Sequence, residues 1–285
     1  MIVVELVGGL GNQLFQYAAG RALAARLGVP LALDRRWFAG GASRGYALDC
    51  FAITAGDADP ALLPMREGKI LGRLLSRLGG KLAIHREAGL AFDPAVTRLP
   101  DNSYLRGNFP SERYFADQEV LIRREFTFAG EPDAPNAALL DEIAKTNAVS
   151  LHIRRGDYVA NPKIAKVHGT VDLGFYTRAM AWIAERVSDP TVFVFSDDPA
   201  WARTNLALTH PTRIVDLNGP EQPAADMRLM AACRHHILAN STFSWWGAWL
   251  NPSPQKIVVA PEPWFRDPAL DSRDIVPKRW VKLPA

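Results

Sequence analysis

In the second half of this 285-residue chain, short apolar runs alternate with longer segments of helical periodicity. Apolar runs of this length that are rich in β-branched and aromatic residues favour buried strands. We expect such strands at 148–153, 191–195, 213–217, 236–239 and 257–260, and helices at 172–187, 199–208, 222–234 and 243–250. Strands that alternate with helices predict a doubly wound parallel sheet.

The first half begins with a similar unit and then becomes irregular. A strand at 2–7 leads through a glycine turn into a helix at 12–27, and a second strand follows at 31–33. Prolines break up the stretch from about 55 to 135, where we expect a strand at 103–106 and short helices at 67–78 and 111–124. Two prolines and a glycine fall within 129–136. We therefore predict two domains, an N-terminal α/β domain of residues 1–135 and a C-terminal Rossmann-like domain of residues 136–285.

Composition excludes several classes of function. Hydrophobic residues make up 48% of the chain and charged residues 22%, the balance of a globular protein. The net charge is only +3 with both signs mixed, so we expect no nucleic-acid partner. The cysteines, Cys50 and Cys233, have neither disulfide-framework nor zinc spacing, which indicates a reducing compartment. The chain has no bilayer-length apolar run and no signal peptide.

Polar side chains follow three of the predicted C-terminal strands. His152-Ile-Arg-Arg-Gly-Asp-Tyr158 comes after the first strand, Ser196-Asp-Asp198 after the second and Asn240-Ser-Thr-Phe-Ser244 after the fourth. The carboxyl ends of parallel strands meet at one edge of a sheet, which is where open α/β sheets bind ligands. We therefore predict a ligand site at this edge.

The adjacent arginines Arg154 and Arg155 indicate an anionic ligand. A guanidinium group holds phosphate oxygens in a bidentate fork and keeps its charge at all ordinary pH values. The alternative is an interdomain ion pair, for example with Asp157, and it is stronger for Arg155 because neighbouring residues of an extended chain point in opposite directions.

Asp197 and Asp198 admit three interpretations. A carboxylate pair after a strand could hold a metal, but no third ligand stands nearby and the two arginines already supply positive charge. We prefer a carboxylate that accepts a hydrogen bond from a base or a ribose. The remaining alternative is that Asp198, which precedes Pro199, caps a helix.

The polar residues Asn240, Ser241, Thr242 and Ser244 precede a helix. They can cap it, and the free N–H groups at such a helix start also bind phosphate, so the two interpretations are compatible.

Core packing is the preferred interpretation of the aromatic cluster Trp245, Trp246 and Trp249, with a sugar platform as the alternative. We assign His235 and His236 to a strand without a catalytic role, and Cys233 to the core.

The opening turn, Gly8-Gly-Leu-Gly-Asn-Gln13, has an alternative interpretation. A strand, glycines, a helix and then Asp34 imitate a dinucleotide-binding fold. However, Leu14 stands where the third glycine of that motif belongs, and Asn12 and Gln13 place amides where the turn usually stays small. A nicotinamide-dependent oxidoreductase is therefore a minor alternative.

Together these motifs resemble the bacterial α-1,2-fucosyltransferases of glycosyltransferase family 11. The opening Gly8-Gly-Leu-Gly-Asn-Gln-Leu-Phe-Gln-Tyr17 is similar to the N-terminal motif of that family. His152-Ile-Arg-Arg-Gly-Asp-Tyr158 is similar to its His-x-Arg-Arg-x-Asp-Tyr motif, and Phe195-Ser-Asp-Asp198 and Asn240–Asn251 are similar to its later motifs. The matches run in order over most of the chain, and the stretch 35–135 carries none.

The resemblance implies a GT-B-like fold, in which two α/β domains face a cleft and the C-terminal domain holds the donor. It implies transfer of L-fucose from GDP-β-L-fucose to the 2-OH of a terminal galactose, with inversion and without a metal or other cofactor. By the family pattern, Arg154 holds the diphosphate with Arg155 beside it, His152 and either Asp197 or Asp198 contact the nucleoside, and the stretch 241–244 contacts phosphate. The loop at Gly11 and Asn12 reaches the donor from the N-terminal domain.

Chemistry and resemblance agree on the leaving group. Breaking the sugar–phosphate bond develops negative charge on the nucleotide, which Arg154 and helix-end N–H groups are placed to stabilise. The base that deprotonates the acceptor is left open among Asp157, His168 and Glu5, and a dissociative route would need no strong base.

The other alternative is a non-catalytic module that binds a glycan or a nucleotide. The first motif begins at residue 8, so we expect no membrane anchor and predict a cytoplasmic bacterial enzyme of surface-polysaccharide synthesis, such as O-antigen assembly. Its acceptor is a galactose-terminated oligosaccharide that could be lipid-linked. The basic residues of 66–86 could attach the protein peripherally to the membrane, with a solvated helix face as the commoner alternative.

Overall fold

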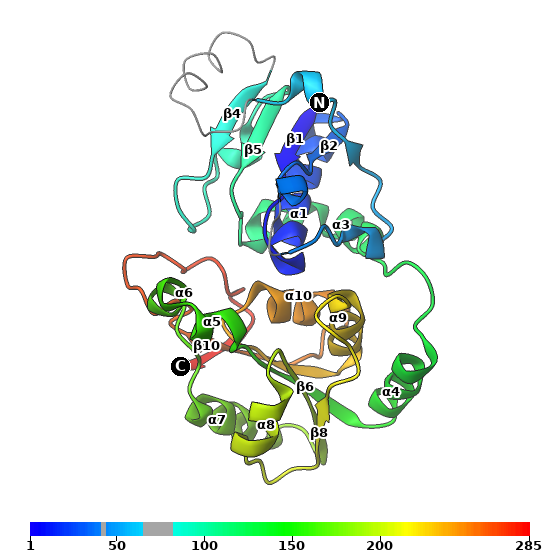
Figure 1. Ribbon diagram of the computed structural model, residues 1–285, viewed down its shortest axis with the longest axis vertical. Helices are drawn as coiled ribbons and strands as arrows, with labels where there is room; N and C mark the ends of the chain where they lie inside the picture. Colours follow the sequence, from blue (N-terminus) through cyan, green and yellow to red (C-terminus); the bar gives the residue numbers. More distant parts are fainter. Residues whose placement is uncertain (41–43, 65–81) are drawn as a thin grey trace. The chain divides into compact units, whose positions relative to one another are not determined.

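The computed structural model describes residues 1–40, 44–64 and 82–285, and Figure 1 shows its ribbon. Contacts divide the chain into two compact units, Met1–Thr127 and Phe128–Ala285. The predicted helix at 67–78 lies outside the described residues, as does most of the basic stretch 66–86. No helix within the described ranges is long and apolar enough to cross a membrane.

The N-terminal unit is a parallel sheet of five strands in the order β3-β2-β1-β5-β4. The strands are β1 (Ile2–Glu5), β2 (Leu31–Asp34), β3 (Gly56–Asp57), β4 (Ala83–Arg86) and β5 (Ser103–Arg106). The helices are α1 (Leu10–Leu27) and α3 (Glu119–Glu125), with 3-10 turns at Phe38–Gly40, Leu48–Cys50, Pro60–Leu62, Val96–Arg98, Glu112–Tyr114 and Ala116–Gln118. The predicted strand at 103–106 is confirmed.

The predicted helix at 111–124 is correct only in its last part, α3. Two 3-10 turns precede that helix because Phe115, with a φ of −136°, interrupts the helical backbone between them. Within this unit α1 is the main helix, and nearly all of its first four turns are buried. It ends at Gly28, which adopts the left-handed conformation that favours glycine (φ 65°).

The C-terminal unit is a parallel sheet of six strands in the order β11-β10-β9-β6-β7-β8, which confirms the predicted doubly wound class. Its strands are β6 (Asn147–Ile153), β7 (Pro190–Ser196), β8 (Thr212–Val215), β9 (His235–Ile237), β10 (Val258–Glu262) and β11 (Val281–Pro284). Its helices are α4 (Ala134–Ala144), α5 (Gly156–Ala160), α6 (Pro162–Val167), α7 (Leu173–Ala184), α8 (Pro199–Asn205), α9 (Pro223–Ala232) and α10 (Thr242–Leu250).

Strand order reverses next to β6, and this position locates the site. The chain runs outward from β6 to β7 and β8, then returns to β9 on the other side of β6. Ligands of open parallel sheets bind at such a switch point, outside the carboxyl ends of the strands. The motifs that follow β6 and β9 therefore flank the expected binding position.

Helices cover both faces of this sheet. Alternate residues of β7 face opposite sides, with Val192 and Val194 in the core cluster that contains α7, and Phe193 and Phe195 in the cluster that contains α4 and α9. Figure 1 shows α7 and α8 on one side of the C-terminal sheet and α9 and α10 on the other. Both faces are thus buried, which explains the nearly continuous apolar strands in the sequence.

The aromatic cluster of α10 belongs to the core, as predicted. Trp245, Trp246 and Trp249 are at most 1% exposed, and the Trp245 Nε1–H donates to the carbonyl of Ile275 at 2.8 Å. These rings are therefore not available as a sugar platform.

The structural assignments of Cys233 and the histidine pair are also confirmed. Cys233 is buried and His235 and His236 lie in β9. His236 is held between Ser150 Oγ (2.8 Å from Nδ1) and Asn251 Nδ2 (3.0 Å from Nε2), so the last residue of the final motif ties the end of α10 to β9.

Candidate functional site

The three polar clusters predicted from sequence meet at the carboxyl edge of the C-terminal sheet. Ile153 at the end of β6 is the register partner of Ser196 at the end of β7, so Arg154 and Asp197 leave the sheet side by side. The third cluster joins them because the Tyr158 hydroxyl donates to the carbonyl of Asn240 at 3.1 Å. The predicted edge therefore exists and its motifs are in mutual contact.

Arg154 is held by two carboxylates. Its Nη1 lies 2.9 Å from Asp197 Oδ2 and its Nη2 lies 2.5 Å from Asp157 Oδ1, while its guanidinium carbon stands 5.4 Å from the centre of the Tyr158 ring. The ion pair with Asp157 considered from sequence thus forms, but within one unit. A guanidinium has five N–H donors, so two carboxylate contacts leave others for a ligand. The side chain is 18% exposed, which makes it reachable.

Asp197 organises the turn that carries the arginines. Its Oδ1 accepts from the backbone N–H of Arg155 at 2.8 Å while its Oδ2 pairs with Arg154. Gly156 allows this approach, because a Cβ at that position would lie 2.5 Å from Asp197 Oδ2. The sequence analysis missed this role of Gly156. The signal was a glycine at the start of a helical turn between charged residues.

Arg155 points away from Arg154, toward α8. Its guanidinium carbon lies 3.8 Å from the centre of the Trp201 ring and its Nε lies 3.5 Å from Asp198 Oδ2. Asp198 also accepts from the N–H of Trp201 at 3.0 Å, so the helix-cap interpretation of Asp198 is confirmed. The turn thus combines two arginines with three aspartates.

The start of α10 has two kinds of polar side chain. Ser241 caps the helix by accepting from the N–H of Phe243 at 3.3 Å, and Thr242 is the first helical residue. Ser244 is fully buried and its hydroxyl donates to the carbonyls of Ala239 (3.3 Å) and Ser241 (3.1 Å). Contact of this stretch with phosphate stays a prediction.

Asn240 holds a neighbouring loop instead of capping α10. Its Nδ2 donates to the carbonyls of His168 (2.9 Å) and Gly169 (3.2 Å). Its Oδ1 is buried and has no hydrogen-bond partner within the described residues. A buried acceptor without a partner is costly, so this oxygen is a candidate contact for a ligand.

His152 lies at the end of β6 and is only 4% exposed. Burial, with a smaller effect of the nearby Arg154 charge, lowers the pKa of His152 to about 3. The imidazole is therefore neutral at physiological pH. Its Nδ1 has no hydrogen-bond partner among the described residues, and Phe243 lies beside the ring at 5.7 Å.

His168 is half-buried rather than an exposed loop residue. Its ring stacks on Tyr158 at 4.6 Å and meets the edge of Phe265 at 5.1 Å. Burial lowers the pKa of His168, Asp157 opposes that shift, and Arg154 adds to it. The ring is therefore neutral at pH 7 and chemically able to accept a proton.

The opening motif of the N-terminal unit is shaped by close contacts. Gly8 has a φ of 78°, and a Cβ there would lie 2.8 Å from the side-chain nitrogen of Asn12. Gly11 is buried in the first turn of α1. Gln13 bonds to the carbonyls of Gly8 and Gly45, both at 2.9 Å, so its amide holds the turn together. Donor contacts of Gly11 and Asn12 stay predictions.

Asp34 is engaged within the fold. The Tyr104 hydroxyl donates to it at 2.7 Å, and Arg36 donates to both of its oxygens at 2.9 and 2.7 Å. Burial opposes ionisation of Asp34, but these hydrogen bonds outweigh it and hold the pKa below its ordinary value. A carboxylate committed in this way does not serve a ribose, which removes the feature that supported a nicotinamide enzyme.

Among the described residues, no three His, Cys, Asp or Glu side chains gather as a metal site would need.

Comparison with solved structures defines the fold class. The NodZ α-1,6-fucosyltransferase of Bradyrhizobium, solved after soaking with GDP-fucose, matches with a TM-score of 0.51 at 17% identity, over 88% of this chain and 92% of that one. Together with the two parallel-sheet α/β units, this likeness shows a GT-B-like fold.

Sequence comparison gives the family. The model of glycosyl transferase family 11 matches residues 93–284. The α-1,2-colitosyltransferase of Escherichia coli is 34% identical over 99% of both chains, and the O-antigen biosynthesis glycosyltransferase WbnK of Escherichia coli is 45% identical over 91% of this chain and 93% of its own. A shorter match, 38% identical over 36% of this chain and 30% of the relative, is to galactoside α-(1,2)-fucosyltransferase 2 of Gorilla gorilla gorilla. The chain belongs to glycosyl transferase family 11 and is a glycosyltransferase.

Proposed function

We propose that this glycosyltransferase moves L-fucose from GDP-β-L-fucose to the 2-OH of a terminal galactose, with inversion and without a metal. The relatives that match over nearly their whole length support an O-antigen role, because one of them is an O-antigen glycosyltransferase. The names of two relatives support an α-1,2 linkage. The same proposal includes that the enzyme acts in the cytoplasm and that its galactose-terminated acceptor is lipid-linked.

The donor sugar has a close competitor. One full-length relative is a colitosyltransferase, and L-colitose is L-fucose without its 3-hydroxyl. We choose fucose because a shorter match is to a galactoside α-(1,2)-fucosyltransferase, and we treat colitose as the second candidate. A site that hydrogen-bonds a sugar hydroxyl strongly rejects the analogue that lacks it, whereas a site without such a bond only weakly rejects an analogue with an added hydroxyl. Comparison of the two donors is therefore decisive.

The observation that carries the proposal is Arg154 at the switch point of the C-terminal sheet. It is partly exposed, it retains N–H donors beyond its two carboxylate contacts, and the Tyr158 hydroxyl of the same motif bonds to the carbonyl of Asn240, two residues before α10. Arg154, Arg155 and the three aspartates sum to one negative charge, so a diphosphate would be held by directed N–H donors rather than by net positive charge. This arrangement suits a leaving group whose charge grows during the reaction.

The reaction then proceeds by displacement at the anomeric carbon. Arg154 stabilises the charge that develops on the leaving diphosphate, which is usually the largest contribution to such catalysis. The sugar acquires oxocarbenium character while the galactose 2-OH attacks from the opposite face and loses its proton. Neutral His152 and the Asn240 side chain are suited to contact the nucleoside, since His152 Nδ1 and Asn240 Oδ1 have no hydrogen-bond partner among the described residues.

As the base that accepts the proton of the galactose 2-OH, we favour His168 over Asp157 and Glu5. The imidazole is neutral at pH 7 and two other motifs fix it, because Tyr158 stacks on the ring and Asn240 binds its carbonyl. Asp157 Oδ1 is already in an ion pair with Arg154. Glu5 is in an ion pair with Arg106, whose Nε lies 2.8 Å from Glu5 Oε2.

The test is transfer to lactose in EDTA from GDP-fucose and, separately, from GDP-colitose. We expect a fucosylated product with an α-1,2 linkage by NMR, and much slower transfer of colitose. Faster transfer from GDP-colitose would show that GDP-colitose, not GDP-fucose, is the donor. A requirement for added Mg²⁺ or Mn²⁺ would overturn the metal-free mechanism. No transfer from either donor, to lactose or to other galactosides, would overturn the proposed function.

A further inference from the structure

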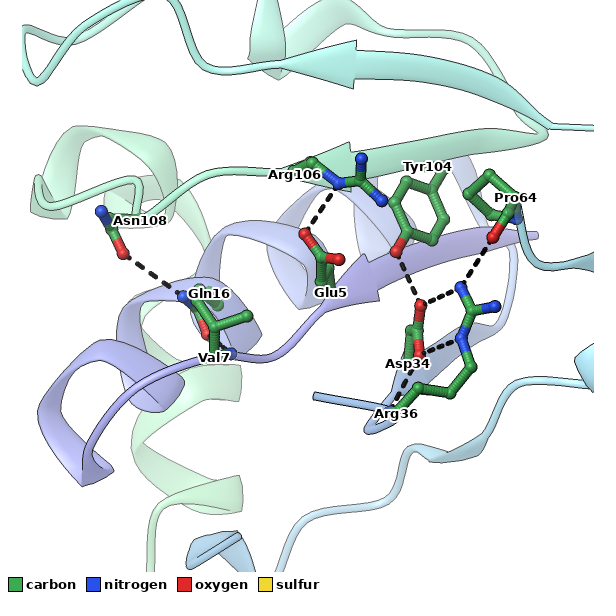
Figure 2. Close-up of polar contacts among 9 residues, drawn as sticks. All are labelled: Glu5, Val7, Gln16, Asp34, Arg36, Pro64, Tyr104, Arg106 and Asn108. Carbon is green, nitrogen blue, oxygen red and sulfur yellow. Dashed lines mark hydrogen bonds and ion pairs between the residues drawn. The ribbon is translucent and has the colours of Figure 1, made fainter. Parts of the chain in front are cut away.

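The N-terminal sheet has a polar edge of its own. Its central strands β2, β1 and β5 end in Asp34, Glu5 and Arg106. Glu5 is the register partner of Asp34, and Arg106 follows Leu105, which pairs with Val4. Figure 2 shows Glu5 pointing toward Arg106, and Asp34 pointing toward Tyr104 and Arg36, at the ends of these strands. This is the edge at which parallel sheets bind ligands.

The inner part of this edge is a closed network. Asp34, only 2% exposed, takes hydrogen bonds from Tyr104 and Arg36, and Arg36 continues to the carbonyl of Pro64 at 2.9 Å. Arg106 lies over the Tyr104 ring, 5.4 Å from its centre. These contacts fix the positions of the strand ends and of the side chains that lie on them.

The outer part is an ion pair that keeps unused hydrogen-bonding capacity. Arg106 Nε lies 2.8 Å from Glu5 Oε2, and the two side chains are 16% and 20% exposed. Among the described residues, Arg106 is the one charged partner that the structure gives Glu5. A carboxylate has about four acceptor positions and a guanidinium five donors, so both groups can bind a further molecule while they remain paired.

We propose that the Glu5–Arg106 pair binds the acceptor sugar, a neutral galactoside, and orients its hydroxyl groups. The inference rests on the proposed function and names the residues that hold its second substrate. Each end of the pair would bond to one of two neighbouring hydroxyls, with Glu5 accepting and Arg106 donating. Asn108, two residues after Arg106, is a candidate further donor: Gln16 Nε2 bonds to its Oδ1 at 3.4 Å, and its amide nitrogen points away from Gln16 (Figure 2).

Charge distinguishes the ligand of this edge from a phosphate. Glu5 and Asp34 balance Arg106 and Arg36, so these four groups carry no net charge. Alternating donors and acceptors without net charge suit the hydroxyls of a neutral sugar. A diphosphate, by contrast, would face the Glu5 carboxylate.

Three aromatic residues follow the end of β2 in the sequence. Trp37 and Phe38 come directly after Arg36 and meet edge to face at 5.1 Å, and Tyr46 contacts Phe38 at 5.8 Å. All three are only partly buried. Partly exposed rings near polar hydrogen-bonding groups provide the apolar surface against which the C–H face of a sugar ring can lie.

The experiment measures steady-state transfer to lactose, together with GDP affinity, for Glu5→Gln and Arg106→Gln. We expect the KM for lactose to rise about 10- to 100-fold in each variant, the effect of losing a hydrogen bond to a charged group. GDP affinity should stay unchanged. The matched control is Glu119→Gln, which removes an exposed ion pair with Arg123 on α3 of the same unit and should leave both quantities unchanged.

Thermal unfolding establishes that each variant is folded, and Glu5→Asp and Arg106→Lys replace any variant that is not. An unchanged lactose KM in folded variants would overturn the inference while the proposed function stands. If the wild-type protein transfers no sugar, the proposed function fails, and saturation-transfer NMR with lactose and GDP decides the inference alone. Saturation of lactose that is lost in both variants supports it, and no saturation with the wild type overturns it.

Discussion

Replacing Gly156 with alanine tests the arrangement of the arginine turn without removing any charged group. The new Cβ would lie 2.5 Å from Asp197 Oδ2 and 3.2 Å from Asp197 Cγ. Ordinary non-bonded contacts are about 3.5–4.0 Å, so the carboxylate must move by roughly 1 Å. That movement would break its contacts with the Arg155 N–H (2.8 Å) and Arg154 Nη1 (2.9 Å).

The magnitude follows from the cost of misplacing a catalytic group. A shift of about 1 Å costs on the order of 100-fold in rate, so we expect kcat to fall about 100-fold and GDP affinity to weaken. Alanine is the better helix former by up to about 1 kcal/mol, which offsets part of the lost hydrogen bonding. The free energy of unfolding should therefore change by no more than about 2 kcal/mol.

The assay is fucosyl transfer to lactose, with calorimetric GDP titration and urea unfolding on the same preparations. The matched control is Gly219→Ala, because a Cβ at Gly219 meets no atom within 4 Å. Wild-type turnover and GDP affinity in a folded Gly156→Ala protein would refute the role given to Asp197 in orienting Arg154.

Three further predictions concern titratable groups. His168→Ala should lower kcat and abolish the acid limb of the kcat/KM profile, which in the wild type should lie below pH 6.5 because the pKa of His168 is lowered; an unchanged profile would remove His168 as the base. Asp34→Asn should cost about 1–3 kcal/mol in the free energy of unfolding, since one amide oxygen replaces a carboxylate that accepts from both Arg36 and Tyr104; urea unfolding measures this, and a loss below about 0.5 kcal/mol would contradict the network. Burial lowers the pKa of His152 in the folded protein to about 3. Between pH 6.5 and 3 the unfolded state therefore binds more protons, and the free energy of unfolding decreases as the pH is lowered. From pH 7 to 5 the wild type should lose about 2 kcal/mol more than a His152→Asn variant, and parallel curves would show that His152 is not buried as described.

The sequence was sufficient to predict the C-terminal fold and the edge that carries the site. Continuous apolar runs such as 191–195 mark strands buried on both faces, and their alternation with helices indicates a parallel sheet, as observed. The three polar motifs could be placed together because each directly follows a strand. The same reasoning correctly assigned the tryptophans of α10 to the core, whereas the helix cap at Asp198 was only the alternative to the preferred contact with a base or a ribose.

Other elements leave too weak a pattern. β11 is a short edge strand whose residues are alternately half-buried and exposed, and it forms because β10 offers a free edge. α5 and α6 are too short to show periodicity, and the latter depends on capping by Asn161. The stretch 129–136, predicted as a domain boundary, also contains the start of α4, where Asp133 caps the helix and Pro135 occupies its first turn.

Contacts between distant segments could not be predicted at all. Glu5 and Arg106 meet only because β1 and β5 are neighbours in one register, and nothing in either local sequence indicates that pairing. The close approach of Gly156 to Asp197 is of the same kind, since it depends on how two loops leave adjacent strands. Sequence motifs named the charged residues of the site, but the structure was needed to show their partners.

The most direct test of the central claim is calorimetric titration of GDP and UDP in EDTA into the wild-type protein and Arg154→Ala. The account predicts metal-free binding of GDP in preference to UDP, and loss of that binding in a variant that stays folded. Equal affinity of the variant for GDP, or binding that appears only with added metal, would contradict a diphosphate site built on Arg154 at the edge of the C-terminal sheet.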